Sequence, residues 1–433
     1  MRAAVAWALA LLVALASAAP AVVCAAEVGQ GRIEKAAAEP QNWLTYGGGY
    51  ASQRYSALSQ ITPANVKTLQ SQWVLQDNVV GVWQSNPLVV DGIMYVTQRP
   101  NEVVALDART GKRLWHFQVV HHDIWDFDTE SPPALMDIRR GGKTIPAVGV
   151  VSKSGYMFIL DRVTGKPVYK VEEKPVPASD VPGEEASPTQ PFPQKPAPIA
   201  RTTMTRADLA QVTPELKAYC EGFVDKNNVN MGGPYLPTGA GRITVNFPGT
   251  LGGANWGGGT FDPRLGYYIV NTHDLAQVQQ LAPDPTGPLA FKQGPGLGRF
   301  WQDATRLPCQ APPWGRLVAV DVNTGDIVWQ SVLGVSDNLP EGKQKTGRPN
   351  IGGAISTAGG LVFVAATDDA RFRAFDTKTG AELWTAKLPA AAHATPMTYR
   401  GKDGKQYVVI VSTGGSFLNS PIVSDAVTAY ALP

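Results

Sequence analysis

Short apolar runs alternate with polar, glycine-containing turns along most of this chain, and one such turn recurs. The phrase Asp-x-x-Thr-Gly-x-x-x-aromatic occurs four times, and the aromatic lies eight positions after the aspartate in every copy. An apolar run before each phrase predicts a strand, the polar phrase a tight turn, and the residues after it a second strand. The four copies are Asp107/Thr110/Gly111/Trp115, Asp161/Thr164/Gly165/Tyr169, Asp321/Thr324/Gly325/Trp329 and Asp376/Thr379/Gly380/Trp384.

Hairpins repeated at constant internal spacing are typical of an all-β β-propeller, whereas chance recurrence in a β-rich protein would not hold the spacing. Glycine supplies the positive φ of the turn, and the aromatic is expected to fill the gap between neighbouring sheets. Outside two excursions, the length is enough for about five blades, a reduced or incomplete ring. Further strand-like runs occur at 87–97, 103–106, 146–151, 156–160, 243–247, 267–271, 317–321, 361–366 and 406–411.

Two segments interrupt the strand pattern. Eight prolines between Val171 and Ala200 predict an ordered surface excursion, because proline lacks the donor that a sheet interior needs. Thr205 and Thr213-Pro214-Glu215 then predict helix starts and a small helical insert at about 205–227, within an excursion of about 171–230. A second excursion, rich in proline and glycine, is predicted at about 281–313.

Residues 1–26 have the features of a secretory signal: Met1-Arg2, an apolar run from Ala3 to Val23, and small residues at cleavage sites. A retained membrane anchor is the alternative. We therefore expect a periplasmic protein whose residues 27–433 form a single propeller domain. Removal of Cys24 would leave Cys220 and Cys309, which could form a disulfide in an oxidising compartment, although sequence cannot show that they meet.

Charge argues against a nucleic-acid or polybasic membrane-surface role, because 38 lysines and arginines nearly balance 36 acidic residues. The 44 glycines and 35 prolines suit a turn-rich chain of many short strands. No Cys-x-x-Cys-His sequence occurs, so covalent haem is not expected.

Candidate chemistry lies in the polar run from His121 to Asp128, which holds three carboxylates and two imidazoles beside Trp125. A solvated loop is the alternative, and zinc lacks a regularly spaced third ligand. Lys153 is a cation next to an apolar strand, for which a snorkelling surface lysine is the plainer interpretation.

Several motifs together resemble the pyrroloquinoline-quinone (PQQ) dependent dehydrogenases, a family of periplasmic propellers that oxidise alcohols or aldoses, and most of all the propeller of the quinoprotein glucose dehydrogenases. The matching segments cover nearly everything from Gln41 to Pro433. They are Trp43-x-x-Tyr46-Gly47-Gly48 with Arg54-Tyr55-Ser56, 115–118 leading into 121–126, 171–177, 187–192, Gly253-Ala254-Asn255-Trp256-Gly257-Gly258, 312–315 and 350–361.

The resemblance implies roles for four residues. Asp126 would be the general base on the substrate hydroxyl and a ligand of Ca²⁺, and Lys153 would hydrogen-bond the quinone oxygens of PQQ. Asn255 and Trp256 would contact the cofactor. The partners implied are a small sugar or alcohol and a membrane quinone or another electron acceptor.

One departure from the family concerns the residues after Trp115. His116-Phe117-Gln118 at once begin the segment that leads to Asp126, whereas several blades lie between these points in the family. Those blades carry an adjacent-cysteine disulfide, a tryptophan that stacks on the cofactor, an arginine and other carboxylate binders, and a Glu and an Asn that complete the Ca²⁺ shell. We therefore expect an incomplete site, and a join that falls within a repeat phrase.

Two functions remain open from the sequence: a PQQ-dependent glucose or alcohol dehydrogenase, and a non-catalytic propeller that acts as an interaction scaffold or is a degenerate remnant. A nicotinamide enzyme is a distant third, because Gly294-x-Gly296-x-Gly298 lies in a proline-rich loop rather than between a strand and a helix.

Overall fold

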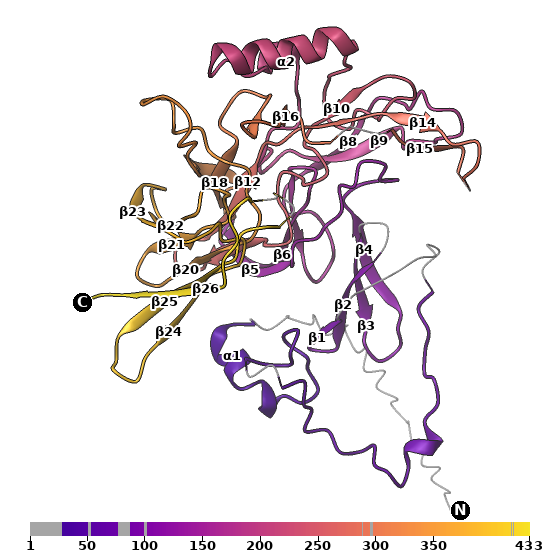
Figure 1. Cartoon of the computed structure of the whole chain (residues 1–433). Helices are drawn as coiled ribbons and strands as arrows, with labels where there is room; N and C mark the ends of the chain where they lie inside the picture. The colour runs from indigo at the N-terminus through magenta and orange to yellow at the C-terminus, as the bar shows by residue number, and fades with distance from the viewer. Residues whose placement is uncertain are drawn as a thin grey trace, which may run out of the picture.

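The computed structural model describes residues 28–50, 53–76, 87–98, 102–287, 289–294, 298–416, 418 and 420–433. Antiparallel sheets of three or four strands, each a propeller blade, dominate this part of the chain (Figure 1). The blades, in chain order, are β1 (Leu88–Val90), β2 (Ile93–Gln98), β3 (Glu102–Asp107) and β4 (Arg113–Gln118); β5 (Ala134–Arg140), β6 (Lys143–Val151) and β7 (Met157–Asp161); β11 (Gly259–Asp262), β12 (Tyr267–His273), β18 (Gly315–Asp321) and β19 (Asp326–Val332); β20 (Ala354–Ser356), β21 (Leu361–Val364), β22 (Arg371–Asp376) and β23 (Glu382–Lys387); and β24 (Met397–Arg400), β25 (Gln406–Ser412) and β26 (Ala426–Ala431).

The all-β propeller predicted from the repeat is confirmed, and five such blades occur among the described residues. Smaller two-stranded sheets lie outside the blades, and those formed by β14 to β17 are inserted within one blade: β8 (Val171–Pro175) with β9 (Thr189–Pro193), β10 (Thr244–Asn246) with β13 (Gln277–Gln279), β14 (Leu281–Pro283) with β15 (Phe291–Gln293), and β16 (Trp301–Gln302) with β17 (Leu307–Pro308). The helices are α1 (Gln30–Glu34), α2 (Pro214–Asn227) and the 3₁₀ turns Ala36–Ala38, Val66–Thr68 and Arg206–Asp208.

The aromatic of each repeat docks on the turn of the following repeat. The Trp115 indole donates a hydrogen bond to the carbonyl of Arg162, at 3.1 Å. Tyr169 donates in the same way to Val322 at 2.7 Å, and Trp329 to Thr377 at 3.1 Å. Each acceptor is the residue after the aspartate of the next phrase. The aromatic of one repeat therefore joins its blade to the turn of the next blade. Trp115 joins the sheet that contains the predicted join, β1 to β4, to the next sheet, β5 to β7, through the same contact as in the other pairs.

Glycine is required where the aromatic lies against the next turn. A Cβ built on Gly165 would lie 2.6 Å from the Trp115 ring, and φ at Gly165 is +71°. Gly325 against Tyr169 and Gly380 against Trp329 are equally close. Trp384, in the last copy, has no following phrase and instead packs edge-on against Tyr430 of β26, with ring centroids 5.0 Å apart.

Gly165→Ala is expected to lower the free energy of unfolding by about 2 kcal/mol or more, because the methyl group overpacks the Trp115 contact and the left-handed backbone disfavours a Cβ. Urea unfolding followed by tryptophan fluorescence measures the loss. Gly183→Ala is the matched control, since φ there is +84° but no atom lies within 4 Å of the added Cβ. Equal losses in the two variants would show that the backbone, not the docking contact, sets the requirement.

The strand predicted after Gly165 is wrong, because that blade has three strands. Only an isolated bridge joins Pro167 to Leu160, with the Asp161 N–H donating to Lys166 and the Val168 N–H donating to Ile159, both at 2.8 Å. The proline-rich segment likewise avoids a sheet interior: β8 and β9 pair only with each other. Pro175, Pro191 and Pro193 therefore lie in strands that each have a free edge, in agreement with the predicted excursion.

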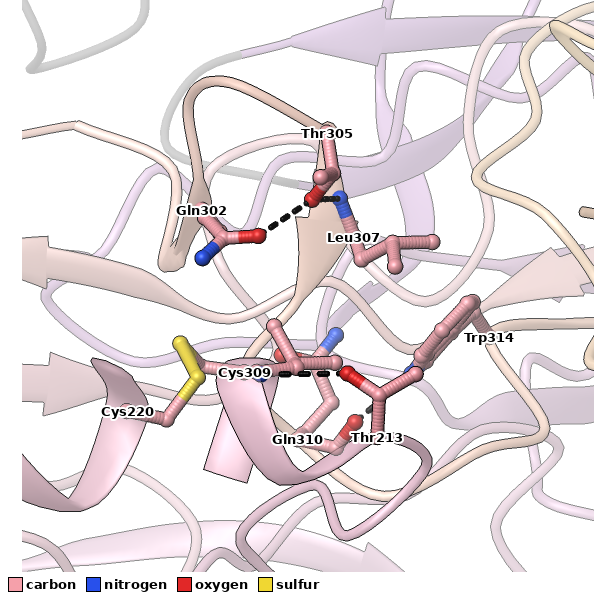
Figure 2. The surroundings of a disulfide bond; sticks show 9 residues. Thr213, Cys220, Gln302, Thr305, Leu307, Cys309, Gln310 and Trp314 are labelled. Atoms are coloured by element: carbon pink, nitrogen blue, oxygen red, sulfur yellow. Dashed lines mark hydrogen bonds between the residues drawn. A yellow bond between two sulfur atoms is a disulfide. The ribbon is translucent and has the colours of Figure 1, made fainter. Parts of the chain in front are cut away.

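The predicted helical insert is confirmed. Thr205 caps the 3₁₀ turn through a capping box with Asp208, and the Thr213 hydroxyl accepts the Leu216 N–H at the start of α2, where Pro214 is the first helical residue. A disulfide joins Cys220 of α2 to Cys309 after β17, so the two cysteines do meet (Figure 2). Figure 1 shows α2 at the end of the molecule farthest from the N-terminal segment.

The second predicted excursion lies between β12 and β18, two strands that pair directly with each other. It carries β13 to β17 and packs with α2 into one apolar core that includes Leu216, Phe247, Phe300 and Trp314. The predicted signal, residues 1–26, lies outside the described residues. Among the residues that are described, no helix is long and apolar enough to cross a membrane.

Candidate functional site in the pocket around Asp126 and Lys153

The loop between β4 and β5 is built by its polar residues. The Asp123 carboxylate accepts the N–H groups of Trp125 and Phe127, at 2.9 and 2.8 Å. His121 contacts Gln118 at 2.7 Å and Glu173 at 3.0 Å through its ring nitrogens. These residues tie the loop to itself and to β8, so they shape the site, and the loop is not the freely solvated segment considered as an alternative.

Alternation along residues 125–130 separates an apolar side from an acidic side. Trp125 and Phe127 are buried in an aromatic cluster with Tyr156, Phe192 and Tyr235. The backbone at Asp126, between them, is left-handed, with φ at +66°. Asp126, Asp128 and Glu130 present three carboxylates to one partner, the Lys153 ammonium.

Lys153 lies in the turn between β6 and β7 and is almost completely buried, with 5% of its surface exposed. Its Nζ lies 3.1 Å from Asp126, 2.7 Å from Asp128 and 2.7 Å from Glu130. The interpretation as a snorkelling surface lysine is therefore wrong. Removing this one cation would leave three neighbouring carboxylates without compensation, although solvent reaches all three and screens their repulsion.

The pKa values of this cluster reflect competition between burial and charge. Burial alone would lower the pKa of Lys153, but hydrogen bonds and charges from Asp128, Glu130 and Asp126 outweigh it and raise the pKa. Partial burial raises the pKa of Asp126 to about 6; Lys153 opposes this shift and Asp128 adds to it. Burial also raises the pKa of Glu130, again against Lys153. Asp126 is thus a carboxylate that can gain and lose a proton near neutral pH.

Glycine brings the Asn255 loop against Lys153. A Cβ on Gly252 would lie 2.4 Å from the Lys153 backbone, and the Gly253 N–H donates to the Lys153 carbonyl at 2.8 Å. The Asn255 amide is used within its own loop: it donates to the Leu251 carbonyl and accepts the Trp256 N–H, both at 2.8 Å. Asn255 therefore orders the loop that carries Trp256, whose side chain remains 43% exposed.

Residues of the Asp126 loop, the Lys153 turn and the Asn255 loop line one pocket of about 540 Å³. All four residues singled out from the sequence, Asp126, Lys153, Asn255 and Trp256, are brought together there, although their roles stay predictions. The pocket is completed by Glu130, Thr250, Leu251, Gln277, Gly298 and Arg299.

Sequence reasoning missed Asp128, Glu130 and Arg299. The first two could have been found, since they follow Asp126 at intervals of two in a stretch without helical periodicity. No local signal marks Arg299, because only the path of the second excursion brings it to the pocket.

The pocket fits a flat, multiply charged organic molecule better than a metal ion. Its volume, the partly exposed Trp256 indole and two cations would suit PQQ. Within the described ranges, no three His, Cys, Asp or Glu side chains are arranged to hold a metal, because the carboxylates converge on Lys153 instead. Ca²⁺ takes six or more oxygen ligands, more than these residues supply, and calcium ligation by Asp126 stays a prediction.

Comparison with known proteins gives the family. The β-propeller domain model described as glucose/ethanol/alcohol dehydrogenase, PQQ, matches residues 43–113 and 100–408. The chain belongs to the PQQ-dependent dehydrogenase family. The two matched segments overlap around the first repeat phrase, which is where the sequence places the join.

Three relatives in the quinoprotein family illustrate the similarity. The chain is 40% identical to a quinate/shikimate dehydrogenase (quinone) of Acinetobacter baylyi over 82% of this chain and 46% of the relative. It is 38% identical to quinoprotein glucose dehydrogenase A of Acinetobacter calcoaceticus (77% and 44%) and 35% identical to a glycerol dehydrogenase large subunit of Gluconobacter oxydans (76% and 49%). The chain thus spans about half the length of the curated relatives that it matches.

Solved structures agree on the fold. A europium-containing methanol dehydrogenase aligns with a TM-score of 0.50 at 21% identity, over 75% of this chain and 49% of that one. A quinohemoprotein alcohol dehydrogenase from Comamonas testosteroni aligns with a TM-score of 0.50 at 22% identity, over 78% and 46%. Both are propellers of the quinoprotein family, in agreement with the sequence prediction.

Proposed function

We propose that this chain is a periplasmic, PQQ-dependent dehydrogenase that oxidises an aldose or another polyhydroxylated alcohol and passes the electrons to a membrane quinone. One observation carries the proposal: in a chain of this family, Asp126 and Lys153 meet at 3.1 Å in the wall of a pocket large enough for a cofactor and a small substrate.

The residues would divide the chemistry between them. PQQ, when bound, supplies a carbon that accepts hydride from the substrate. Asp126 would accept the proton of the substrate hydroxyl, a role that suits a carboxylate with a pKa of about 6. Lys153 would stabilise negative charge on the acceptor oxygen with an ammonium that three carboxylates keep protonated and fixed in place. Trp256 would supply an apolar surface beside the cofactor.

The test is reduction of an artificial electron acceptor by purified protein loaded with PQQ. We expect PQQ-dependent reduction with at least one of glucose, ethanol, glycerol and quinate, the last two chosen because relatives are named for them. Assays with and without Ca²⁺ test the predicted metal dependence. No PQQ binding at any Ca²⁺ concentration would instead favour the non-catalytic scaffold, and transport of a tagged chain to the periplasm tests its location.

A further inference from the structure

A second cation lines the pocket without a carboxylate partner among the described residues. Arg299 lines the same pocket as Asp126, Glu130 and Lys153. No described carboxylate lies within 4 Å of its guanidinium, and its Nε is buried without a hydrogen-bond acceptor. Lys153, by contrast, contacts three carboxylates. Arginine is rarely buried without an anion, so its isolation here requires an explanation.

The backbone fixes the position of Arg299. The Arg299 residue bridges to Gln277 of β13, and hydrogen bonds on either side join Val278 to Gly298 at 2.8 Å and Phe300 to Ala276 at 2.9 Å. Phe300 is buried in the core that contains α2 and the disulfide. The arginine is therefore held at the pocket by a packed element.

The surroundings of the guanidinium are a ring and a second cation. Its Cζ lies 5.4 Å from the centroid of the Trp301 ring, an attractive cation–π contact, and Arg306 lies 5.1 Å from the same ring. Burial lowers the pKa of Arg299, and the charge of Arg306 lowers it further. Arginine remains charged in proteins, so the result is a partly desolvated positive charge repelled by its neighbour. An anion would relieve both effects.

We propose that Arg299 binds the carboxylate of the substrate, so that the pocket favours a hydroxy acid over a neutral sugar or alcohol; this rests on the proposed function. A guanidinium pairs with a carboxylate through two parallel hydrogen bonds. A singly charged group suits the site better than a dianionic phosphate, because the carboxylates of Asp126 and Glu130 line the same pocket. PQQ also carries carboxylates, so the experiment must distinguish a substrate carboxylate from a PQQ carboxylate as the group that pairs with Arg299.

The experiment compares quinate with its uncharged methyl ester on PQQ-loaded protein. In the wild type we expect KM for quinate to be lower than for the ester. Arg299→Gln should raise KM for quinate by about 10- to 100-fold, the range for losing a charge-assisted pair, and leave KM for the ester nearly unchanged. Calorimetric titration of quinate into the protein measures binding without turnover, and PQQ titration by fluorescence quenching measures the cofactor separately.

Arg306→Gln is the matched control, because Arg306 contacts the same indole but does not line the pocket. It should leave the ratio of the two KM values unchanged. An unchanged ratio in Arg299→Gln, or weaker PQQ binding with an unchanged ratio, would overturn the assignment to the substrate. A wild-type protein that binds no PQQ would refute the proposed function, whereas quinate binding that depends on Arg299 would still support the carboxylate site.

Discussion

Asp126→Asn is expected to reduce PQQ-dependent dye reduction by about 10²- to 10⁴-fold, the usual contribution of a general base. Asparagine keeps the size of the side chain and tolerates the left-handed backbone at this position, where φ is +66°. Lys153 would retain Asp128 and Glu130 as partners. The substitution therefore removes the proton acceptor while leaving the cluster paired, and kcat with saturating substrate and PQQ measures the loss.

The pH profile gives this prediction a second measurement. Because the pKa of Asp126 is raised to about 6, the carboxylate is ionised only above that value, and wild-type kcat should rise as pH increases through about 6. Any residual activity of Asp126→Asn should lack this rise.

Asp326→Asn is a matched control for the charge change. Both aspartates have side chains that are 57% exposed and a lysine within 3.1 Å. Asp326, however, lies on β19, an outer strand of its blade, and pairs there with Lys195. Asp326→Asn should leave kcat within about twofold of the wild type, as expected for an exposed ion pair of small energy. Activity of Asp126→Asn within tenfold of the wild type would contradict its role as the base.

Loss of the disulfide is expected to have the largest effect on stability. The Cys220→Ser/Cys309→Ser protein should unfold with a free energy about 4 kcal/mol lower than the wild type, because the bond closes a loop with a sequence separation of 89. Equilibrium urea unfolding, with and without dithiothreitol, measures the difference. Dithiothreitol should destabilise the wild type alone.

The same bond also bears on the pocket. The Cys309 N–H donates to the Phe300 carbonyl at 2.9 Å, next to Arg299, and Thr305 and Gln302 hold the connecting turn (Figure 2). We expect the reduced protein to lose selectivity for quinate before it loses the blades. Identical unfolding of oxidised and reduced wild-type protein would contradict the stabilising role.

The repeat explains how a shortened chain can keep a propeller architecture. Three pairs of consecutive blades contact each other through the same aromatic, carbonyl and glycine, so Trp115 meets at Gly165 the same surface that Tyr169 and Trp329 meet at the following copies. Removal of whole blades keeps every remaining interface of this type. What such a removal changes is the site, since ligands contributed by the missing blades have no replacement in the repeat.

The blades, the helix starts at Thr205 and Thr213, and the excursions follow from local chemistry that is visible in the sequence. Strand periodicity, capping side chains and proline act over a few residues, and for that reason their consequences could be predicted without a structure. The strand predicted after Gly165 is the local prediction that failed, since only an isolated bridge forms there.

Asp126, Lys153, Asn255 and Trp256 were chosen from motifs, but only the fold establishes that one pocket contains them all. The burial of Lys153, the pairing of Cys220 with Cys309 and the presence of Arg299 were decided by tertiary structure alone. Each depends on segments that are far apart in the chain and are brought together by packing between elements. The polarity of one residue does not indicate which distant charged residue will lie beside it. The sequence by itself determined the repeated blade and its joining device; the packing of the two excursions decided which charges meet.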